Sequence, residues 1–140
     1  FFIAGFDTTS SVIIHTLYEL SLNPDEQEKV HQEIDELLEL HEGFNYENIS
    51  QLEYLKMSLY EAMRKHSSAP FLARVCVKDC ALPNSDYVVP KGMNVIIPVT
   101  GLNYDPDIFP DPEKFDPTRF SKDNIAARHP FAYLPFRAGP

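Results

Sequence analysis

Prolines divide this chain into two parts that allow different structures. Eleven of the twelve prolines lie at or beyond Pro70. Proline removes a backbone donor and clashes with the preceding helical turn, so the second part cannot sustain long helices. We therefore predict a mainly α chain with a small β region, with helices over 1–68, short strands over 69–103 and largely irregular structure over 104–140.

Two helices are predicted before residue 43. The first covers about 1–22, where apolar residues recur at near-helical intervals. Pro24 can occupy the first position of a second helix, with Asn23 as its N-cap and Glu26 completing a capping box. Apolar residues then follow one stripe, and we expect this helix to end before Gly43.

A third helix is predicted over about 51–66, because Ser50 and Glu53 form a capping-box pattern ahead of regularly spaced leucines. Three later runs are β-branched or alternate in polarity and predict short strands (73–77, 87–89 and 94–99). Closely spaced prolines then exclude regular structure over 104–120. Phenylalanines interleaved among these prolines favour an ordered loop.

Composition excludes several function classes. The formal net charge is -9 at pH 7, whereas nucleic-acid-binding surfaces are rich in Lys and Arg, so no nucleic-acid partner is expected. Cys76 and Cys80 lie four apart in a stretch of strand-like composition. Side chains at that spacing share a face but lie too far apart to bridge, so we expect free thiols in a reducing compartment. No apolar run reaches the roughly 20 residues of a membrane span, and no signal peptide is recognisable.

The first predicted helix is apolar except for one polar stripe. Residues three and four apart share a face of a helix, which groups four side chains: Asp7, Thr8, Ser11 and His15. The Thr8 hydroxyl can bond the carbonyl of Ala4, and Gly5 beside it would let the helix widen and admit water or a ligand. A solvent-facing stripe with a tolerated glycine explains the same pattern, and the residues alone leave both interpretations open.

Charged residues on the third predicted helix suggest a buried network. Glu61 and Arg64 are three apart and can pair along the helix. An exposed pair of this kind contributes little, whereas a loop arginine such as Arg119 could join them in a buried arrangement that fixes the loop.

Motifs for metal-dependent hydrolysis and for nucleotide binding are absent from the sequence. The acidic segment 105–116 has Phe109 and Pro110 where a calcium loop needs an oxygen ligand and a glycine, and turn-forming Asp-Pro units explain its acids better. The histidines form no His-Glu-x-x-His. The chain also has no Gly-x-Ser-x-Gly elbow, Walker loop or Gly-x-Gly-x-x-Gly turn.

Four motifs, in order along the whole chain, resemble those of the cytochrome P450 family of haem-thiolate monooxygenases. They are Ala4-Gly5-Phe6-Asp7-Thr8-Thr9 of the oxygen-activating helix, Glu61-Ala62-Met63-Arg64, Phe115-Asp116-Pro117-Thr118-Arg119-Phe120 of the meander, and Tyr133-Leu134-Pro135-Phe136 with Gly139-Pro140 at the start of the haem-binding loop. The segment 101–106 is similar to animal microsomal members, nearest the insect branch associated with foreign-compound metabolism. Residues 1–140 would then be an internal part of one such domain.

The resemblance implies roles for individual residues. Asp7 and Thr8 would be catalytic, organising proton delivery to dioxygen above the haem iron. Four residues would contact the cofactor: Ala4, Gly5, Arg74, which would pair with a haem propionate, and Phe136. Glu61, Arg64 and Arg119 would form the structural network. The segment 69–72 would border the substrate pocket.

The resemblance also implies an activity for the full-length protein. It would insert one oxygen atom of dioxygen into an organic, lipophilic substrate, with a thiolate-ligated haem as cofactor and electrons from an NADPH-dependent reductase. It would lie on the cytoplasmic face of the endoplasmic reticulum membrane, held by an N-terminal segment that precedes this chain. The axial cysteine is expected beyond Pro140, so the chain alone is expected to be inactive. Arg137 stands where the family has glycine, which favours a rival: a non-catalytic haem-binding or interaction module.

Overall fold

The computed structural model describes residues 2–41 and 43–136. Helices form most of the regular structure, and the strands form two small antiparallel sheets of two strands each. The predicted fold class, mainly α with a small β region, is therefore confirmed. Among the described residues, no helix is both long and apolar enough to cross a membrane.

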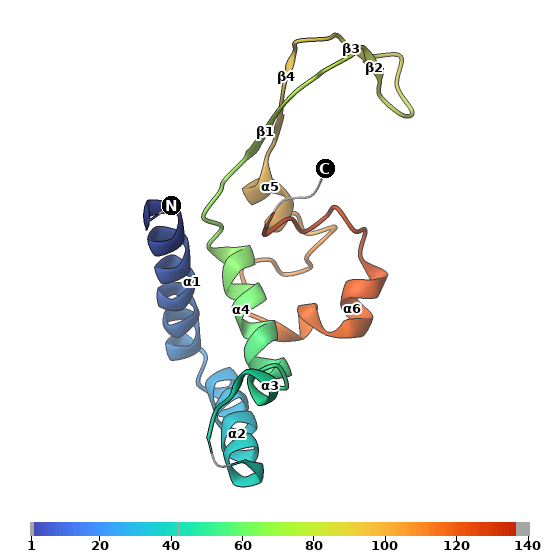
Figure 1. The fold of residues 1–140 in the computed structure, drawn as a ribbon. Helices are drawn as coiled ribbons and strands as arrows, with labels where there is room; N and C mark the ends of the chain where they lie inside the picture. Colours follow the sequence, from blue (N-terminus) through green and yellow to red (C-terminus); the bar gives the residue numbers. More distant parts are fainter. Residues whose placement is uncertain (1, 42, 137–140) are drawn as a thin grey trace.

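Three helices form the body of the chain (Figure 1). They are α1 (Phe2–Leu22), α2 (Pro24–Leu40) and α4 (Glu53–Lys65), and each packs against the other two. Their shared core contains Leu20, Val30 and Ala62, together with Phe115 from the segment that follows the strands. Leu20 and Val30 belong to the predicted apolar stripes, whereas most of the predicted stripe of α1, from Phe2 to Leu17, is exposed. Burial of the core residues is the main favourable term that holds the helices together.

Helix α2 begins at Pro24 as predicted, but the predicted capping box at its start is wrong. Asn23 makes no side-chain cap. Its amide Nδ2 instead donates to the carbonyl of Glu19, at 2.8 Å. Glu26 pairs with Lys29 at 2.9 Å and accepts a hydrogen bond from the Tyr54 hydroxyl. The side chains that could have capped α2 are engaged by α1 and α4.

A short helix, α3 (Tyr46–Ile49), was missed by the sequence analysis, and the capping box at Ser50 and Glu53 is also wrong. The capping box lies earlier, because Asn45 accepts from the backbone of Asn48 at 2.9 Å and the Asn48 side chain accepts from the backbone of Asn45 at 2.8 Å. Ser50 is the C-cap of α3.

The N-terminus of α4 is capped by a side chain from α2. The Glu33 carboxylate accepts hydrogen bonds from the backbone N–H groups of Tyr54 at 2.7 Å and Leu55 at 2.9 Å. The first N–H groups of a helix lack partners within it, and an anion there is also favoured by the helix dipole. This tertiary cap replaces the local one that the sequence predicts and starts α4 at Glu53.

The strands form a narrow ribbon that extends from the helical body (Figure 1). Strand β1 (Leu72–Val75) pairs with β4 (Asn94–Ile97), and farther out β2 (Cys80–Ala81) pairs with β3 (Val88–Val89). The predicted strands are therefore too long, and β2 was missed. Between the two pairs Gly92 has φ 88°, a conformation that glycine adopts at no steric cost.

The predicted strand over 94–99 is also wrong at its end, because Val99 begins helix α5 (Val99–Asn103). The backbone N–H of Thr100 donates to the carbonyl of Pro70 at 3.1 Å, which turns the chain back toward α4.

The segment after α5 is ordered, but it contains two short helices that the sequence analysis missed. They are the 3₁₀ helix η1 (Pro117–Phe120), which packs against α4, and α6 (Lys122–Ala127). Asp116 and Ser121 cap them through side-chain oxygens. The interleaved phenylalanines Phe109, Phe115 and Phe120 are all buried, which explains the order.

Candidate functional site

The best-defined polar cluster is a buried ion pair within α4. Glu61 and Arg64 lie one helical turn apart, and both side chains are 0% exposed. Arg64 donates from Nε to Oε2 at 2.7 Å and from Nη2 to Oε1 at 2.9 Å. This bidentate geometry is the strongest form of guanidinium–carboxylate pairing.

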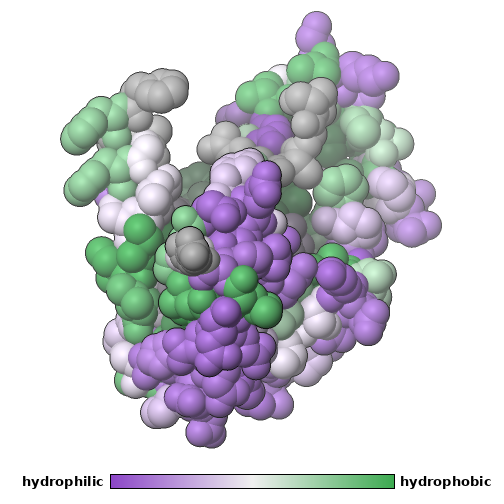
Figure 2. Space-filling view, turned by 60° about the horizontal axis from the view of Figure 1, so that its bottom comes forward, coloured by the Kyte–Doolittle hydropathy of each residue, from purple (hydrophilic) through white to green (hydrophobic). Residues whose placement is uncertain are grey.

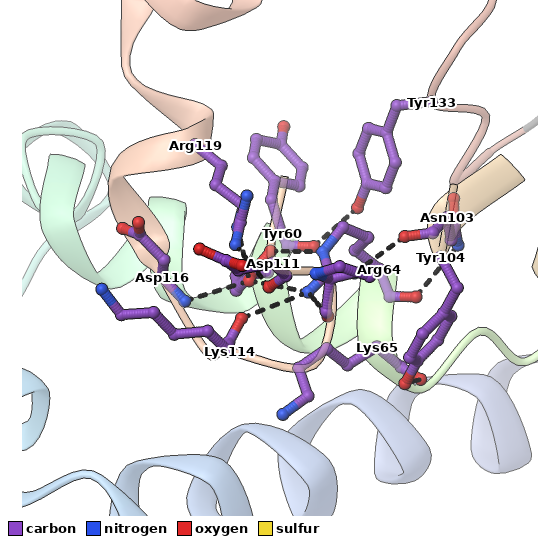
Figure 3. Close-up of polar contacts among 12 residues, drawn as sticks. Tyr60, Arg64, Lys65, Asn103, Tyr104, Asp111, Lys114, Asp116, Arg119 and Tyr133 are labelled. Carbon is purple, nitrogen blue, oxygen red and sulfur yellow. Dashed lines mark hydrogen bonds and ion pairs between the residues drawn. The ribbon is translucent and has the colours of Figure 1, made fainter. Parts of the chain in front are cut away.

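Arg64 also binds backbone carbonyls from the segment beyond the strands (Figure 3). Its Nη1 donates to the carbonyl of Asn103 at 2.7 Å, and Nη2 donates to the carbonyl of Pro112 at 2.7 Å. Asn103 returns a hydrogen bond from Nδ2 to the Arg64 carbonyl at 3.0 Å. The guanidinium carbon lies 5.2 Å from the centre of the Phe109 ring. One side chain therefore ties two distant segments, around 103 and around 112, to α4.

Arg119 approaches the same carboxylate from η1. Its Nε lies 3.3 Å from Oε1 of Glu61 but does not point along a hydrogen-bonding direction, so the contact is an ion pair rather than a hydrogen bond. Arg119 Nη2 donates instead to the carbonyl of Asp111 at 2.9 Å. Oε1 also accepts from the backbone N–H of Asp116 at 3.0 Å. The structure thus brings Glu61, Arg64 and Arg119 together from two elements.

Two further members of this cluster were missed by the sequence analysis. Tyr133 donates to the carbonyl of Tyr60 on α4 at 2.8 Å, and burial, followed by the charge of Glu61, raises the pKa of its phenol. Arg128 lies with its guanidinium 4.3 Å from the centre of the Phe109 ring and donates to the carbonyl of Arg119 at 2.8 Å. Neither residue belongs to a local charge pattern, so only the fold reveals their place.

The polar stripe of α1 divides into two parts. Asp7 and Thr8 are exposed, and a Cβ at Gly5 would meet nothing within 4 Å. His15 Nδ1 shares a hydrogen bond with the Ser11 hydroxyl at 3.2 Å, and its ring stacks on that of His66, the C-cap residue of α4, with the ring centres 4.3 Å apart. The solvent-facing interpretation therefore does not hold for the whole stripe.

The local widening of the first helix is not seen, because residues Phe2–Leu22 form one continuous α-helix. In a continuous α-helix each carbonyl accepts from the N–H group four residues later, so the helical turn at Gly5 keeps its ordinary width. The predicted Thr8 hydrogen bond to Ala4, and the role of the Ala4 side chain, lie outside what the structure describes.

The other expected cofactor contacts lie on separate elements. Arg74 is exposed on β1, opposite Val95, and its Nη1 donates to the carbonyl of Ala73 at 3.0 Å. Phe136 is 76% exposed near the C-terminal end of the described chain. Figure 1 shows the start of α1 and this C-terminal segment at the end of the helical body from which the ribbon extends. Arg137, Gly139 and Pro140 lie outside the described residues.

Comparison with known proteins decides the family. The family model described as Cytochrome P450 matches residues 1–140. The chain is 47% identical to "Probable cytochrome P450 6a14" of Drosophila melanogaster, with 100% of this chain and 28% of that protein covered. It is 43% identical to "Cytochrome P450 6B1" of Papilio polyxenes and 39% identical to "Cytochrome P450 4F12" of Homo sapiens, covering 28% and 27% of those proteins.

The chain belongs to the cytochrome P450 family. The resemblance found in the four motifs is thus confirmed, and relatives with high identity include insect members. The chain spans a little over a quarter of the length of these relatives.

Membership of the cytochrome P450 family implies a haem held by a cysteine thiolate. The described residues fit the wall of such a site, because α1 leaves Phe2 and Phe6 exposed beside Gly5, and an exposed guanidinium at Arg74 suits an anionic propionate. Figure 2 shows apolar side chains along the edge of the molecule formed by α1. Neither cysteine fits the axial position, because both lie on the β ribbon.

Proposed function

We propose that the full-length protein is a haem-dependent monooxygenase that inserts one oxygen atom of dioxygen into an organic, lipophilic substrate. The observation that carries this proposal is the Asp7–Thr8 pair, which is exposed on α1 beside the open space over Gly5. The bound haem would supply the activation of dioxygen, and the thiolate would favour cleavage of its oxygen–oxygen bond.

The roles of Asp7 and Thr8 follow from their chemistry and position. The Thr8 hydroxyl can both accept and donate, so it can hold a water molecule and pass a proton to bound dioxygen. The Asp7 carboxylate, one residue earlier and exposed, can take protons from solvent and supply them to this relay. The open space over Gly5 leaves room for a large planar cofactor against α1.

The buried cluster around Glu61 has a structural role in this proposal. Arg64 and Arg119 bind carbonyls at 103, 112 and 111, so one carboxylate holds the segment before the haem-binding loop against α4. Arg74 would pair with a propionate from the ribbon side, Phe136 would border the haem, and residues 69–72 would border the substrate pocket.

The partners and location are proposed from the same resemblance. Electrons would come from an NADPH-dependent reductase, and the full-length protein would lie on the cytoplasmic face of the endoplasmic reticulum membrane. The rival function, a non-catalytic haem-binding or interaction module, depends on Arg137, which lies outside the described residues.

The test uses the purified full-length protein with a microsomal NADPH reductase. We expect a reduced carbon monoxide spectrum of the thiolate type, and incorporation of label from isotopically labelled dioxygen into an oxidised lipophilic substrate. A thiolate-type spectrum without any turnover over a broad panel of lipophilic compounds would favour the non-catalytic rival. Absence of bound haem would refute the monooxygenase and leave only the interaction-module form of the rival.

A further inference from the structure

Positive charge exceeds negative charge around the Glu61 cluster. Three guanidiniums, those of Arg64, Arg119 and Arg128, surround one carboxylate. Arg64 takes both oxygens of Glu61, which leaves Arg119 only the poorly directed contact at 3.3 Å. Among residues 2–41 and 43–136, Arg128 has no ion pair with any carboxylate. Two cations on this side of Glu61 therefore lack a well-placed anion.

These two arginines line one open cleft between the segment after α5 and the end of α6. The cleft has a volume of about 560 Å³, within the range of small-molecule sites. The Arg119 side chain is 10% exposed, and its buried Nε has no hydrogen bond in the part of the chain that the structure describes. A nine-tenths buried guanidinium with an unsatisfied donor is costly unless something binds it.

A third donor faces the same cleft. His129 lines it and is exposed, and its Nδ1 accepts from the backbone N–H of Phe131 at 3.2 Å. A neutral imidazole in that arrangement carries its proton on Nε2, which can donate to a ligand. One carboxylate, that of Asp107, also lines the cleft, without an ion pair to either arginine among the described residues. Two guanidiniums and one carboxylate leave the cleft one positive charge, matching a monoanion.

Apart from Asn124, the rest of the lining is apolar. It comes from two chain segments, which form the two walls: Leu102, Ile108 and Pro110 from one, and Ala127, Phe131 and Ala132 from the other. We propose that this cleft binds an amphipathic monoanion, an organic carboxylate whose oxygens meet Arg119, Arg128 and His129 and whose apolar body lies between the two walls. Burial lowers the pKa of Arg128. The charge of Glu61 opposes this shift, and the neighbouring guanidiniums add to it. A bound anion would relieve this penalty.

The inference does not rest on the proposed function, and its test separates the cleft from the haem. Decanoate is titrated into the full-length holoprotein by calorimetry, while the haem absorption band is followed in parallel. We expect one class of decanoate binding that leaves the haem band unchanged. Decanol, which lacks the charge, should not compete for it, and inorganic phosphate, which lacks the apolar body, should compete only weakly.

Variants test the location. Arg128→Gln removes one guanidinium and should weaken this binding by roughly tenfold or more, as expected for loss of a charge-assisted hydrogen bond. Ala127→Trp fills the cleft from an exposed position without removing a charge, and should have a similar effect even if Arg128→Gln fails to fold. Lys122→Gln removes a cation from the same helix outside the cleft and should leave the affinity unchanged. The proposal is overturned if the shift of the haem band accounts for all of the decanoate binding seen by calorimetry. It is also overturned if Ala127→Trp binds decanoate as tightly as the wild type does.

Discussion

Arg64 donates hydrogen bonds to both carboxylate oxygens of Glu61 from one turn farther along α4, and both side chains are fully buried. Removing two charges from water is expensive, and the attraction between them compensates only when the remaining donors are also satisfied. Arg64 meets this condition through carbonyls of the segment that follows the strands. The pair therefore stabilises a loop position more than it stabilises a helix.

Loss of the Glu61 carboxylate should prevent stable haem incorporation. Glu61→Ala leaves Arg64 and Arg119 buried without their anion, a change that costs about 3–5 kcal/mol. In the full-length protein we expect little or no thiolate-type carbon monoxide spectrum and a large drop in the unfolding midpoint. Glu53→Gln is the matched control on the same helix, because Glu53 is half exposed and, among the described residues, forms an ion pair only with the exposed Lys122. Its stability should change by about 0.5 kcal/mol or less, and equal effects from the two substitutions would refute the network's role.

Thr8→Ala should uncouple reduction of dioxygen from product formation. If the Thr8 hydroxyl relays protons, its loss should lower the product formed per NADPH oxidised, with the reducing equivalents recovered as peroxide or water. General acid–base assistance is worth about 10²–10⁴-fold, so turnover should suffer far more than substrate binding. Asp7→Asn should slow the same proton supply. Coupling and substrate-binding spectra are measured together.

Thr9→Ala is the matched control for the Thr8 prediction. Thr9 is the next residue of α1 and is also exposed, but it faces a different direction because successive helical residues are about 100° apart. Coupling in this variant should remain near wild type, and Thr8→Ser should keep most of the activity. Unchanged coupling in Thr8→Ala would reduce Thr8 to a helix-shaping residue, and matching losses in both variants would indicate a disturbed helix.

Tyr54 should make the stability of the helical body depend on alkaline pH. Burial, followed by the hydrogen bond to Glu26, raises the pKa of its phenol from 10.0 to about 12. The folded state therefore keeps this proton after the unfolded state has lost it. The stabilisation is fully present below about pH 10, and is lost as the pH rises through about 12.

The pH prediction is checked by urea unfolding of the full-length protein across that window. The free energy of unfolding should fall more steeply with pH in the wild type than in Tyr54→Phe, which cannot titrate there. Tyr46→Phe is the control, because Tyr46 is 96% exposed, and it should retain the wild-type slope. Identical slopes in wild type and Tyr54→Phe would contradict the prediction.

The 140-residue chain alone should not form a thiolate-ligated haem. Its two cysteines lie on the ribbon, where Cys76 donates to the carbonyl of Lys78 at 2.9 Å and Cys80 pairs with Val89 of β3. Reconstitution of the purified chain with haem, followed by reduction under carbon monoxide, should give no thiolate-type band. Such a band, abolished by Cys76→Ser or Cys80→Ser, would show that a ribbon cysteine can bind the iron.

Local periodicity accounts for what could be predicted about the helices and about the charged network around Glu61. The apolar stripes of α1, α2 and α4 depend on neighbours three and four residues apart, which are set by helix geometry alone. The spacing of Glu61 and Arg64 likewise places them on adjacent turns. The four family motifs added Arg119, since nothing in its own surroundings points to α4.

Contacts between distant segments decided the rest. Glu33 caps α4 from α2, so the capping box expected at Ser50 never forms. The backbone of Val99 follows a β-branched run, yet it turns into α5 because the next residue bonds back to Pro70. Arg128 carries no local signal and acquires its place only when α6 brings it over the Phe109 ring. A sequence pattern records which residues can pair within a turn or two, whereas packing selects which caps, cations and rings from remote segments meet, because only the folded chain brings them within bonding distance.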